Sequence, residues 1–230
     1  MPIKHIRAIC LDLDDTLWEL GPVIEQAERV LQVWFARHWP RVSERYSIPA
    51  IRALRQQVAG RFPGQEHDPG LLRRATYAEL ARDCGYPGSL GEEAFAVFQQ
   101  ARNQVMPYAD VHPALPRLAR RFPLVALTNG NADLEAIGLH RHFAAVFAAA
   151  GLGVAKPDPR AFQAVCERLS LQPAEIAHAG DHPQHDVAGA RAAGMTAVWV
   201  DRGHHAWPGG LPPAGHVVHD LMELVALVGA

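Results

Sequence analysis

Short runs of apolar residues alternate with segments of helical periodicity along much of the chain. The first run covers residues 6–13 and ends in acidic and hydroxyl residues. Similar runs follow at residues 124–127, 145–147, 176–179 and 197–200. Short runs rich in branched side chains are typical of parallel strands that are buried on both faces. The alternation predicts an α/β fold whose core is a doubly wound, Rossmann-like parallel sheet.

Two helices of this core have recognisable ends. Pro157, Asp158 and Pro159 precede the apolar-periodic segment 161–169, which predicts a helix there. A second helix, rich in small residues, is predicted to begin at Asp186 and to stop at Gly194. The Gly-, Pro- and His-rich stretch 202–215 is expected to be an irregular surface loop.

The pattern changes between about residues 20 and 106, where no strand is predicted. Apolar residues fall there at helical spacing, as in Val23, Ala27 and Leu31. Prolines and Pro-Gly pairs divide the segment into helices of about three or four turns. The first strand precedes this segment and the others follow it. We therefore expect a core of residues 1–17 and 107–230, with an all-helical domain inserted at residues 18–106.

Charge and composition exclude several classes of protein. The 230 residues include 22 Lys and Arg against 24 Asp and Glu, a formal net charge of -2, so binding to nucleic acid is not expected. No apolar run reaches the about 20 residues that a membrane-spanning helix needs, so no membrane partner is expected. Three dispersed cysteines, Cys10, Cys84 and Cys166, favour neither a disulfide framework nor a zinc site, and a cytoplasmic location fits them best.

Polar clusters stand at four places where predicted strands end. The clusters are Asp12-Leu13-Asp14-Asp15-Thr16, Thr128-Asn129-Gly130, Lys156-Pro157, and Gly180-Asp181 followed by Asp186. In open α/β sheets, ligands bind in the crevice beyond the carboxyl ends of the strands. Each cluster alone is more simply explained as a turn, a helix cap or a surface lysine. Their joint occurrence favours a shared site.

In order and spacing, these clusters resemble the four motifs of the haloacid dehalogenase superfamily of phosphohydrolases. The resemblance extends over nearly the whole chain, and it implies that the helical insertion is a cap of the C1 type. Residues 11–17 and 123–131 are most similar to the bacterial phosphatases of flavin mononucleotide and of the riboflavin precursor 5-amino-6-(5-phospho-D-ribitylamino)uracil. The resemblance thus implies an enzyme that hydrolyses a small-molecule phosphate monoester.

The chemistry of phosphoryl transfer gives each acidic residue of this set an expected role. Asp12 is the candidate nucleophile and would form an aspartyl-phosphate. A Mg²⁺ cofactor would be held by the Asp12 carboxylate, the Asp14 backbone carbonyl and Asp181, because hard oxygen ligands favour this ion. Asp186 is expected to act on the metal through water or through a neighbouring ligand.

The remaining polar residues are expected to hold the phosphate. Lys156 would supply a fixed positive charge beside Asp12 and the phosphoryl group. The Thr128 hydroxyl and the backbone N–H groups of Asn129 and Gly130 would donate hydrogen bonds to the phosphoryl oxygens.

The presence of a second carboxylate, Asp14, favours a phosphatase over a dehalogenase. If the chain turns at the end of the strand, Asp14 can protonate the leaving oxygen and then activate the water that hydrolyses the aspartyl-phosphate. Halide leaves without a proton, and the family resemblance implies that dehalogenases share the first motif but lack this second carboxylate. A phosphosugar mutase and a weakly catalytic phosphate-recognising protein remain alternatives.

The sequence leaves other roles open. His182 and His185 lie near Asp181 and are more simply explained without direct metal ligation, while His204 and His205 are expected to lie on a loop surface. Trp18 is expected to pack rather than to contact substrate. Arg73 and Arg74 are candidates for contact with the substrate from the cap, although a solvated helix face explains them more simply. The substrate and the oligomeric state do not follow from these patterns.

Overall fold

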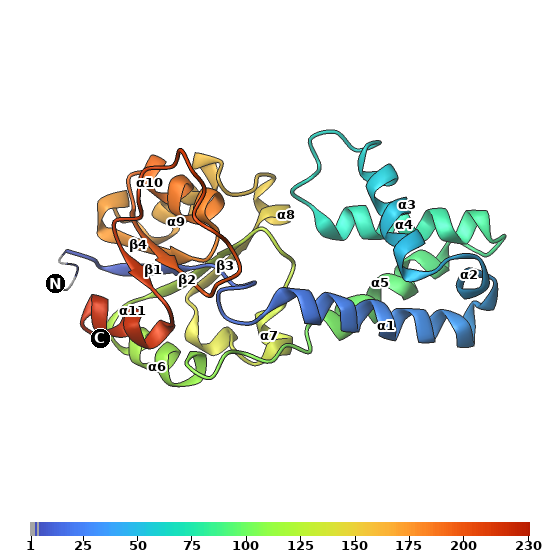
Figure 1. The fold of residues 1–230 in the computed structure, drawn as a ribbon, viewed down its shortest axis with the longest axis horizontal. Helices are drawn as coiled ribbons and strands as arrows, with labels where there is room; N and C mark the ends of the chain where they lie inside the picture. Colours follow the sequence, from blue (N-terminus) through green and yellow to red (C-terminus); the bar gives the residue numbers. More distant parts are fainter. Residues whose placement is uncertain (1–2, 4) are drawn as a thin grey trace. The chain divides into compact units, whose positions relative to one another are not determined.

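The structure is a computed structural model that describes residue 3 and residues 5–230 (Figure 1). The chain divides into two compact units. The sheet unit holds the described residues up to Glu19, Met106–Gly130 and Leu134–Ala230. The helical unit holds Leu20–Val105 and Asn131–Asp133. The helical unit is thus inserted directly after the first strand.

A six-stranded parallel sheet forms the centre of the sheet unit, with the strand order β3-β2-β1-β4-β5-β6. The strands are β1 (Ala8–Leu11), β2 (Leu124–Thr128), β3 (Ala145–Ala148), β4 (Ile176–Gly180), β5 (Thr196–Val200) and β6 (Val217–Val218). All residues of β1, β2 and β4 are buried, as continuous apolar runs require. The predicted doubly wound α/β fold is confirmed. The order reverses at β1, so the carboxyl ends of β1, β2 and β4 form one crevice.

Helices flank the sheet, and Figure 1 places α9 and α10 on one side and α6 and α11 on the other. The helices and short helical turns of this unit are α6 (Val111–Arg121), α7 (Leu134–Ile137), η1 (His140–His142), α8 (Ala149–Leu152), α9 (Pro159–Leu169), η2 (Pro173–Glu175), η3 (Pro183–Ala188), α10 (Gly189–Ala192) and α11 (Leu221–Val228). Cys10 and Val125 of the sheet are buried in one cluster with Phe162 and Val165 of α9. This packing holds β1 and β2 against α9.

The helical segment after β4 begins earlier than predicted. The sequence indicated a start at Asp186, but the π-helical turn η3 begins at Pro183, with His182 as its N-cap. His182 Nδ1 accepts hydrogen bonds from the backbone N–H groups of Gln184 and His185. A histidine ring thus does what a carboxylate cap was expected to do. Asp186 lies within the turn, and its side chain is released for other contacts.

Five helices make up the helical unit: α1 (Leu20–His38), α2 (Pro40–Arg45), α3 (Ile48–Ala59), α4 (Pro69–Asp83) and α5 (Ser89–Arg102). Pro40, Pro49 and Pro69 lie in the first turns of α2, α3 and α4, where a missing N–H costs nothing. With 19 residues, α1 is longer than the three or four turns expected. Leu31, Phe35, Tyr77, Leu80 and Phe98 belong to a separate buried cluster.

No helix in the described part of the chain has both the length and the apolar character needed to cross a lipid bilayer. The three cysteines are free thiols, and Cys10 and Cys84 are buried.

Candidate active site

The ends of β1, β2 and β4 bring the predicted acidic residues together. Asp12 directly follows β1, and its backbone N–H donates to the Ala179 carbonyl of β4 at 3.0 Å. Asp181 follows β4, and Thr128 is the last residue of β2. Because β1 lies between β2 and β4, Asp12 is flanked by both partners. All three side chains are buried in the crevice predicted from the strand pattern.

The chain turns sharply after Leu13, and this turn orients Asp14. The Leu17 N–H donates to the Leu13 carbonyl at 2.7 Å, and Asp15 adopts a left-handed conformation with φ of 58°. The Trp18 indole N–H then donates to Asp14 Oδ1 at 2.9 Å. Trp18 itself is fully buried. Trp18 therefore packs as expected, and it also fixes the carboxylate of Asp14, a role that the sequence did not reveal.

Lys156 lies at the centre of a buried ion network. Its Nζ is 2.6 Å from Asp12 Oδ1 and 2.6 Å from Asp186 Oδ1. His178 Nε2, from within β4, is 2.9 Å from the same Asp186 oxygen, and the His182 N–H donates to Asp186 Oδ2 at 3.0 Å. Both Asp186 oxygens thus have partners within the protein. Asp186 therefore holds the Lys156 ammonium next to the Asp12 carboxylate.

Burial and charge act in opposite directions on this network. Burial raises the pKa of Asp12 well above its usual value, although Lys156 acts against this. Burial alone would also raise the pKa of Asp186, but Lys156 and His178 outweigh it and hold that pKa well below the usual range. Likewise, burial alone would lower the pKa of Lys156, but the two carboxylates outweigh it and raise that pKa. Lys156 therefore carries its positive charge at neutral pH.

Asp181 completes the acidic group. The Thr16 hydroxyl donates to Asp181 Oδ1 at 2.9 Å and is 3.4 Å from Asp12 Oδ2, so it links the two carboxylates. The Trp199 indole N–H donates to the backbone carbonyl of Asp181 at 2.7 Å. Burial raises the pKa of Asp181 to about 7, and the negative charge of Asp186 adds to the effect. Ionised Asp181 thus needs a nearby positive charge.

The donor set fits a divalent cation. Carboxylate oxygens of Asp12, Asp181 and Asp186 lie within 4.8 Å of one another. These three buried acids face the single ammonium of Lys156, which leaves an excess of two negative charges when all are ionised. Carboxylates are preferred ligands of Mg²⁺, and a doubly charged ion balances this excess.

We expect magnesium to stabilise the protein more at high pH than at low pH. The pKa of Asp181 is raised to about 7 in the folded protein, so without metal the free energy of unfolding falls as pH rises from about 4 to about 7. Magnesium needs the ionised carboxylates and removes this loss. Thermal unfolding with magnesium or with a chelator, at about pH 5 and about pH 8, measures the effect. An equal gain in melting temperature at both pH values would contradict it.

Gly180 leaves the space that Asp186 occupies. A Cβ built at Gly180 would lie 2.3 Å from Asp186 Cγ, which no side chain can tolerate. We expect Gly180→Ala to displace the Asp186 carboxyl and to lower the free energy of unfolding by about 1–3 kcal/mol. Gly209→Ala is the matched control, because nothing lies within 4 Å of a Cβ there. Urea unfolding of both variants measures the difference, and equal stability would refute the steric explanation.

The Thr128-Asn129-Gly130 segment is organised differently from the expectation. The Gly130 N–H, expected to face a phosphate, donates to Thr128 Oγ1 at 2.9 Å. The Thr128 hydroxyl oxygen is thus an acceptor, and its hydrogen remains free to point away. The Asn129 side chain accepts from the Lys156 N–H at 2.8 Å and donates to the Lys156 carbonyl at 2.9 Å. The Asn129 side chain therefore positions Lys156.

Histidines lie around the acidic group, and one of them comes from the predicted loop. His205 is partly exposed on this loop, as expected, and its Nε2 also lies 3.2 Å from Asp181 Oδ2. The rings of His182 and His185 stack with centroids 3.9 Å apart. In the described part of the chain, neither ring belongs to a cluster spaced for metal binding. Only the chain path shows that residue 205 returns to the site.

Arg202 is a second residue that the sequence did not reveal. Its guanidinium binds both carboxylate oxygens of Asp110, at 3.0 and 2.7 Å, and donates to the Thr16 carbonyl at 3.1 Å. It also lies 4.3 Å above the ring of Tyr108. Bidentate Arg–carboxylate pairs hold a fixed geometry. This pair therefore fixes the turn that carries Asp14 and Thr16.

Three buried carboxylates and the Lys156 ammonium thus meet at the carboxyl ends of the strands. Residues 6–194 match the family of haloacid dehalogenase-like hydrolases. The chain belongs to this family, as its motifs indicated, and the expectation of an enzyme is confirmed.

Two curated relatives of the chain are named for different substrates. The chain is 33% identical to 5-amino-6-(5-phospho-D-ribitylamino)uracil phosphatase YigB of Escherichia coli, over 86% of this chain and 85% of the relative. It is 32% identical to phosphoserine phosphatase of Thermus thermophilus, over 86% and 90%. Both relatives are named as phosphatases of small molecules.

Among solved structures, the fold is similar to a 2-haloacid dehalogenase from Pseudomonas syringae, with a TM-score of 0.91 and 34% identity over 97% of this chain and 98% of that one. It is also similar to a phosphatase of the same superfamily from Thermococcus onnurineus, with a TM-score of 0.70, 24% identity and coverage of 97% and 98%. The second similarity bears on the fold alone.

Proposed function

We propose that the protein is a Mg²⁺-dependent phosphatase that hydrolyses a small phosphorylated metabolite through an aspartyl-phosphate on Asp12. The observation that carries this proposal is the second carboxylate, Asp14, which the Trp18 indole N–H holds in place. Alkoxide departure needs a proton, whereas halide departure does not. Asp14 therefore favours a phosphatase over a dehalogenase, although a 34% identical structure is named as a dehalogenase.

In the first step, an Asp12 carboxylate oxygen attacks phosphorus and the bond from phosphorus to the ester oxygen breaks. The leaving oxygen takes a proton from Asp14. Lys156, fixed 2.6 Å from Asp12, reduces the repulsion between the carboxylate and the anionic substrate. The Thr128 hydroxyl donates a hydrogen bond to a phosphoryl oxygen.

In the second step, Asp14 accepts a proton from water, and the water oxygen attacks the phosphorus of the aspartyl-phosphate. The bond between phosphorus and Asp12 breaks, which regenerates the carboxylate and releases inorganic phosphate. Asp12 and Asp181 would hold Mg²⁺ directly, with the Asp14 backbone carbonyl as a further ligand and Asp186 acting through Lys156 or water. When bound, the ion neutralises charge on the phosphoryl oxygens.

Similarity to the riboflavin-precursor phosphatase of Escherichia coli supports 5-amino-6-(5-phospho-D-ribitylamino)uracil or flavin mononucleotide as the substrate. The helical unit would act as a cap that excludes water and selects the leaving group. Among the described residues, no specific contact favours a mutase or a pure phosphate-binding protein.

The test is product release from a panel of compounds, with magnesium and with a chelator. The panel contains flavin mononucleotide, the riboflavin-precursor phosphate, phosphoserine, phosphoglycolate and 2-chloropropionate. We expect metal-dependent release of phosphate from at least one ester and no release of chloride. Chloride release, or activity only with an added bisphosphate, would favour the dehalogenase or the mutase.

Trp18→Phe should slow turnover without altering substrate binding. It removes the indole N–H that donates to Asp14 and keeps a buried aromatic ring. We expect kcat to fall by about tenfold with KM unchanged, because proton transfer depends on the position of Asp14. Trp39→Phe is the matched control, since the buried Trp39 Nε1 has no hydrogen-bond partner among the described residues. Equal kcat in both variants would exclude the positioning role.

A further inference from the structure

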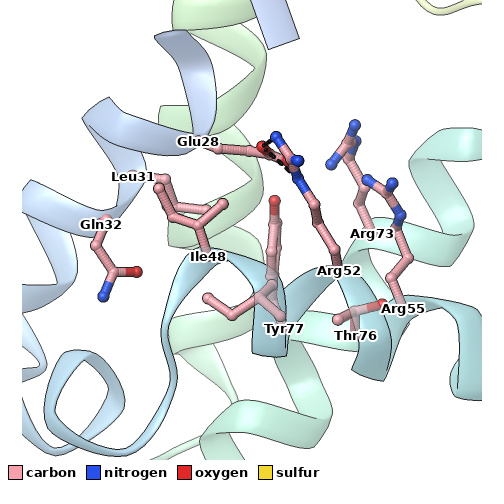
Figure 2. A pocket seen from close by; sticks show the side chains of 10 residues that line it. Glu28, Leu31, Gln32, Ile48, Arg52, Arg55, Arg73, Thr76 and Tyr77 are labelled. Carbon is pink, nitrogen blue, oxygen red and sulfur yellow. Dashed lines mark hydrogen bonds and ion pairs between the residues drawn. The ribbon is translucent and has the colours of Figure 1, made fainter. Parts of the chain in front are cut away.

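A pocket within the helical unit collects three arginines from two helices. It lies among α1, α3 and α4, and its empty space of about 350 Å³ includes open solvent. Figure 2 shows the guanidinium groups of Arg52, Arg55 and Arg73 gathered on one side of it, next to the Tyr77 side chain. None of its lining residues belongs to the Asp12 site.

The positive charge of this pocket exceeds its negative charge. Glu28 is the only carboxylate among the lining residues, and it pairs with Arg52, whose Nε lies 2.9 Å from Glu28 Oε2. Among the described residues, no ion pair involves Arg55 or Arg73. Arg74, the other arginine considered as a substrate contact, instead pairs with Glu92 and lies over Phe95. Two guanidinium groups therefore remain without an anion.

Arg73 is held in place for binding. Its guanidinium carbon lies 3.7 Å from the centroid of the Phe98 ring, so the planar group has a fixed orientation. Burial lowers the pKa of Arg73, and the like charge of Arg55 adds to this effect. Two neighbouring cations that are partly removed from water favour an anion between them.

We propose that this pocket binds a small oxyanion, either a carboxylate or a phosphate group. Guanidinium groups bind both through paired N–H donors, and the Tyr77 hydroxyl supplies a further polar group. The oxyanion is a free ion such as inorganic phosphate or a small carboxylate. Binding itself does not depend on the proposed phosphatase reaction.

Nuclear magnetic resonance of the arginine Nε–H groups tests the proposal, with inorganic phosphate and succinate as probes. We expect the signals of Arg55 and Arg73 to shift to saturation, while chloride at equal ionic strength causes no saturable shift. Arg55→Gln should weaken binding at the Arg73 signal by about tenfold or more. Arg37→Gln makes the same change of charge at an exposed position of α1 and should leave binding at the Arg73 signal unchanged.

Arg73→Lys is a second variant that is expected to keep the fold. Lysine keeps the positive charge but lacks the paired N–H donors of arginine. We expect it to weaken binding at the Arg55 signal while the fold is retained. Absence of a saturable shift, or equal affinity in Arg55→Gln and Arg37→Gln, would overturn the proposal.

The binding measurement needs no turnover, so failure of the proposed phosphatase activity and failure of the anion site are distinguishable.

Discussion

Asp12→Asn is expected to lower phosphatase turnover by about a thousandfold or more, because an amide oxygen cannot form a stable bond to phosphorus and then leave as a carboxylate. The fold should be retained, since asparagine has nearly the same shape and Lys156 keeps its pairing with Asp186. The buried site also loses a carboxylate whose pKa is raised by burial, which removes part of a desolvation cost. Steady-state phosphate release and circular dichroism measure the two effects.

Asp220→Asn is the matched control for this change. Asp220 caps α11 by accepting from the Glu223 N–H, and asparagine caps helices equally well. Wild-type turnover in the control and its loss in Asp12→Asn would attribute the effect to residue 12. Wild-type turnover in Asp12→Asn would show that another group attacks phosphorus.

Lys156→Met is expected to abolish turnover and also to destabilise the protein by about 3–5 kcal/mol at neutral pH. The variant leaves Asp12 and Asp186 buried without the ammonium that now lies 2.6 Å from each. The loss of stability should shrink as pH falls, because protonation removes the unpaired negative charges. Urea unfolding as a function of pH measures this dependence.

Lys156→Arg separates charge from shape. The chain contains 22 Lys and Arg residues, and only residues 4 and 156 are lysines. The Lys156 ammonium is buried between two carboxylates, whereas a guanidinium is larger, planar and spreads its charge. We expect Lys156→Arg to restore part of the stability but not the activity. A Lys156→Met protein as stable as the wild type would show that the ion network contributes little.

Much of the sheet unit could be predicted because its strands are short, continuous apolar runs. The same pattern could not reveal β6, whose two residues are too few to show a period. Prolines predicted where the helical unit divides into helices, because a proline inside a helix removes a hydrogen bond but is tolerated in the first turn. The start of η3 was missed because a histidine ring, rather than a carboxylate, caps it.

The site could be predicted where chemistry requires a residue type at a strand end, as for Asp12 and Asp181. Residues that position these groups were missed, because their partners lie far away in the sequence. His178 is one residue within an apolar run, and only the structure shows that it binds Asp186. Arg202 and His205 reach the site from a loop whose composition indicates only irregular structure. The three-dimensional structure shows that these residues lie near the site, whereas the local sequence pattern does not.

Detection of a phosphoryl group on Asp12 during turnover is the most direct measurement of the proposed reaction. The Asp14→Asn variant, in which hydrolysis of the aspartyl-phosphate is slowed, is mixed with magnesium and p-nitrophenyl phosphate, quenched in acid and treated with borohydride. Borohydride reduces an acyl phosphate to the alcohol, which marks the modified residue for peptide mass mapping. We expect the modification at Asp12. Nitrophenol release in a burst with no modification at Asp12, or with modification elsewhere, would contradict the proposed mechanism.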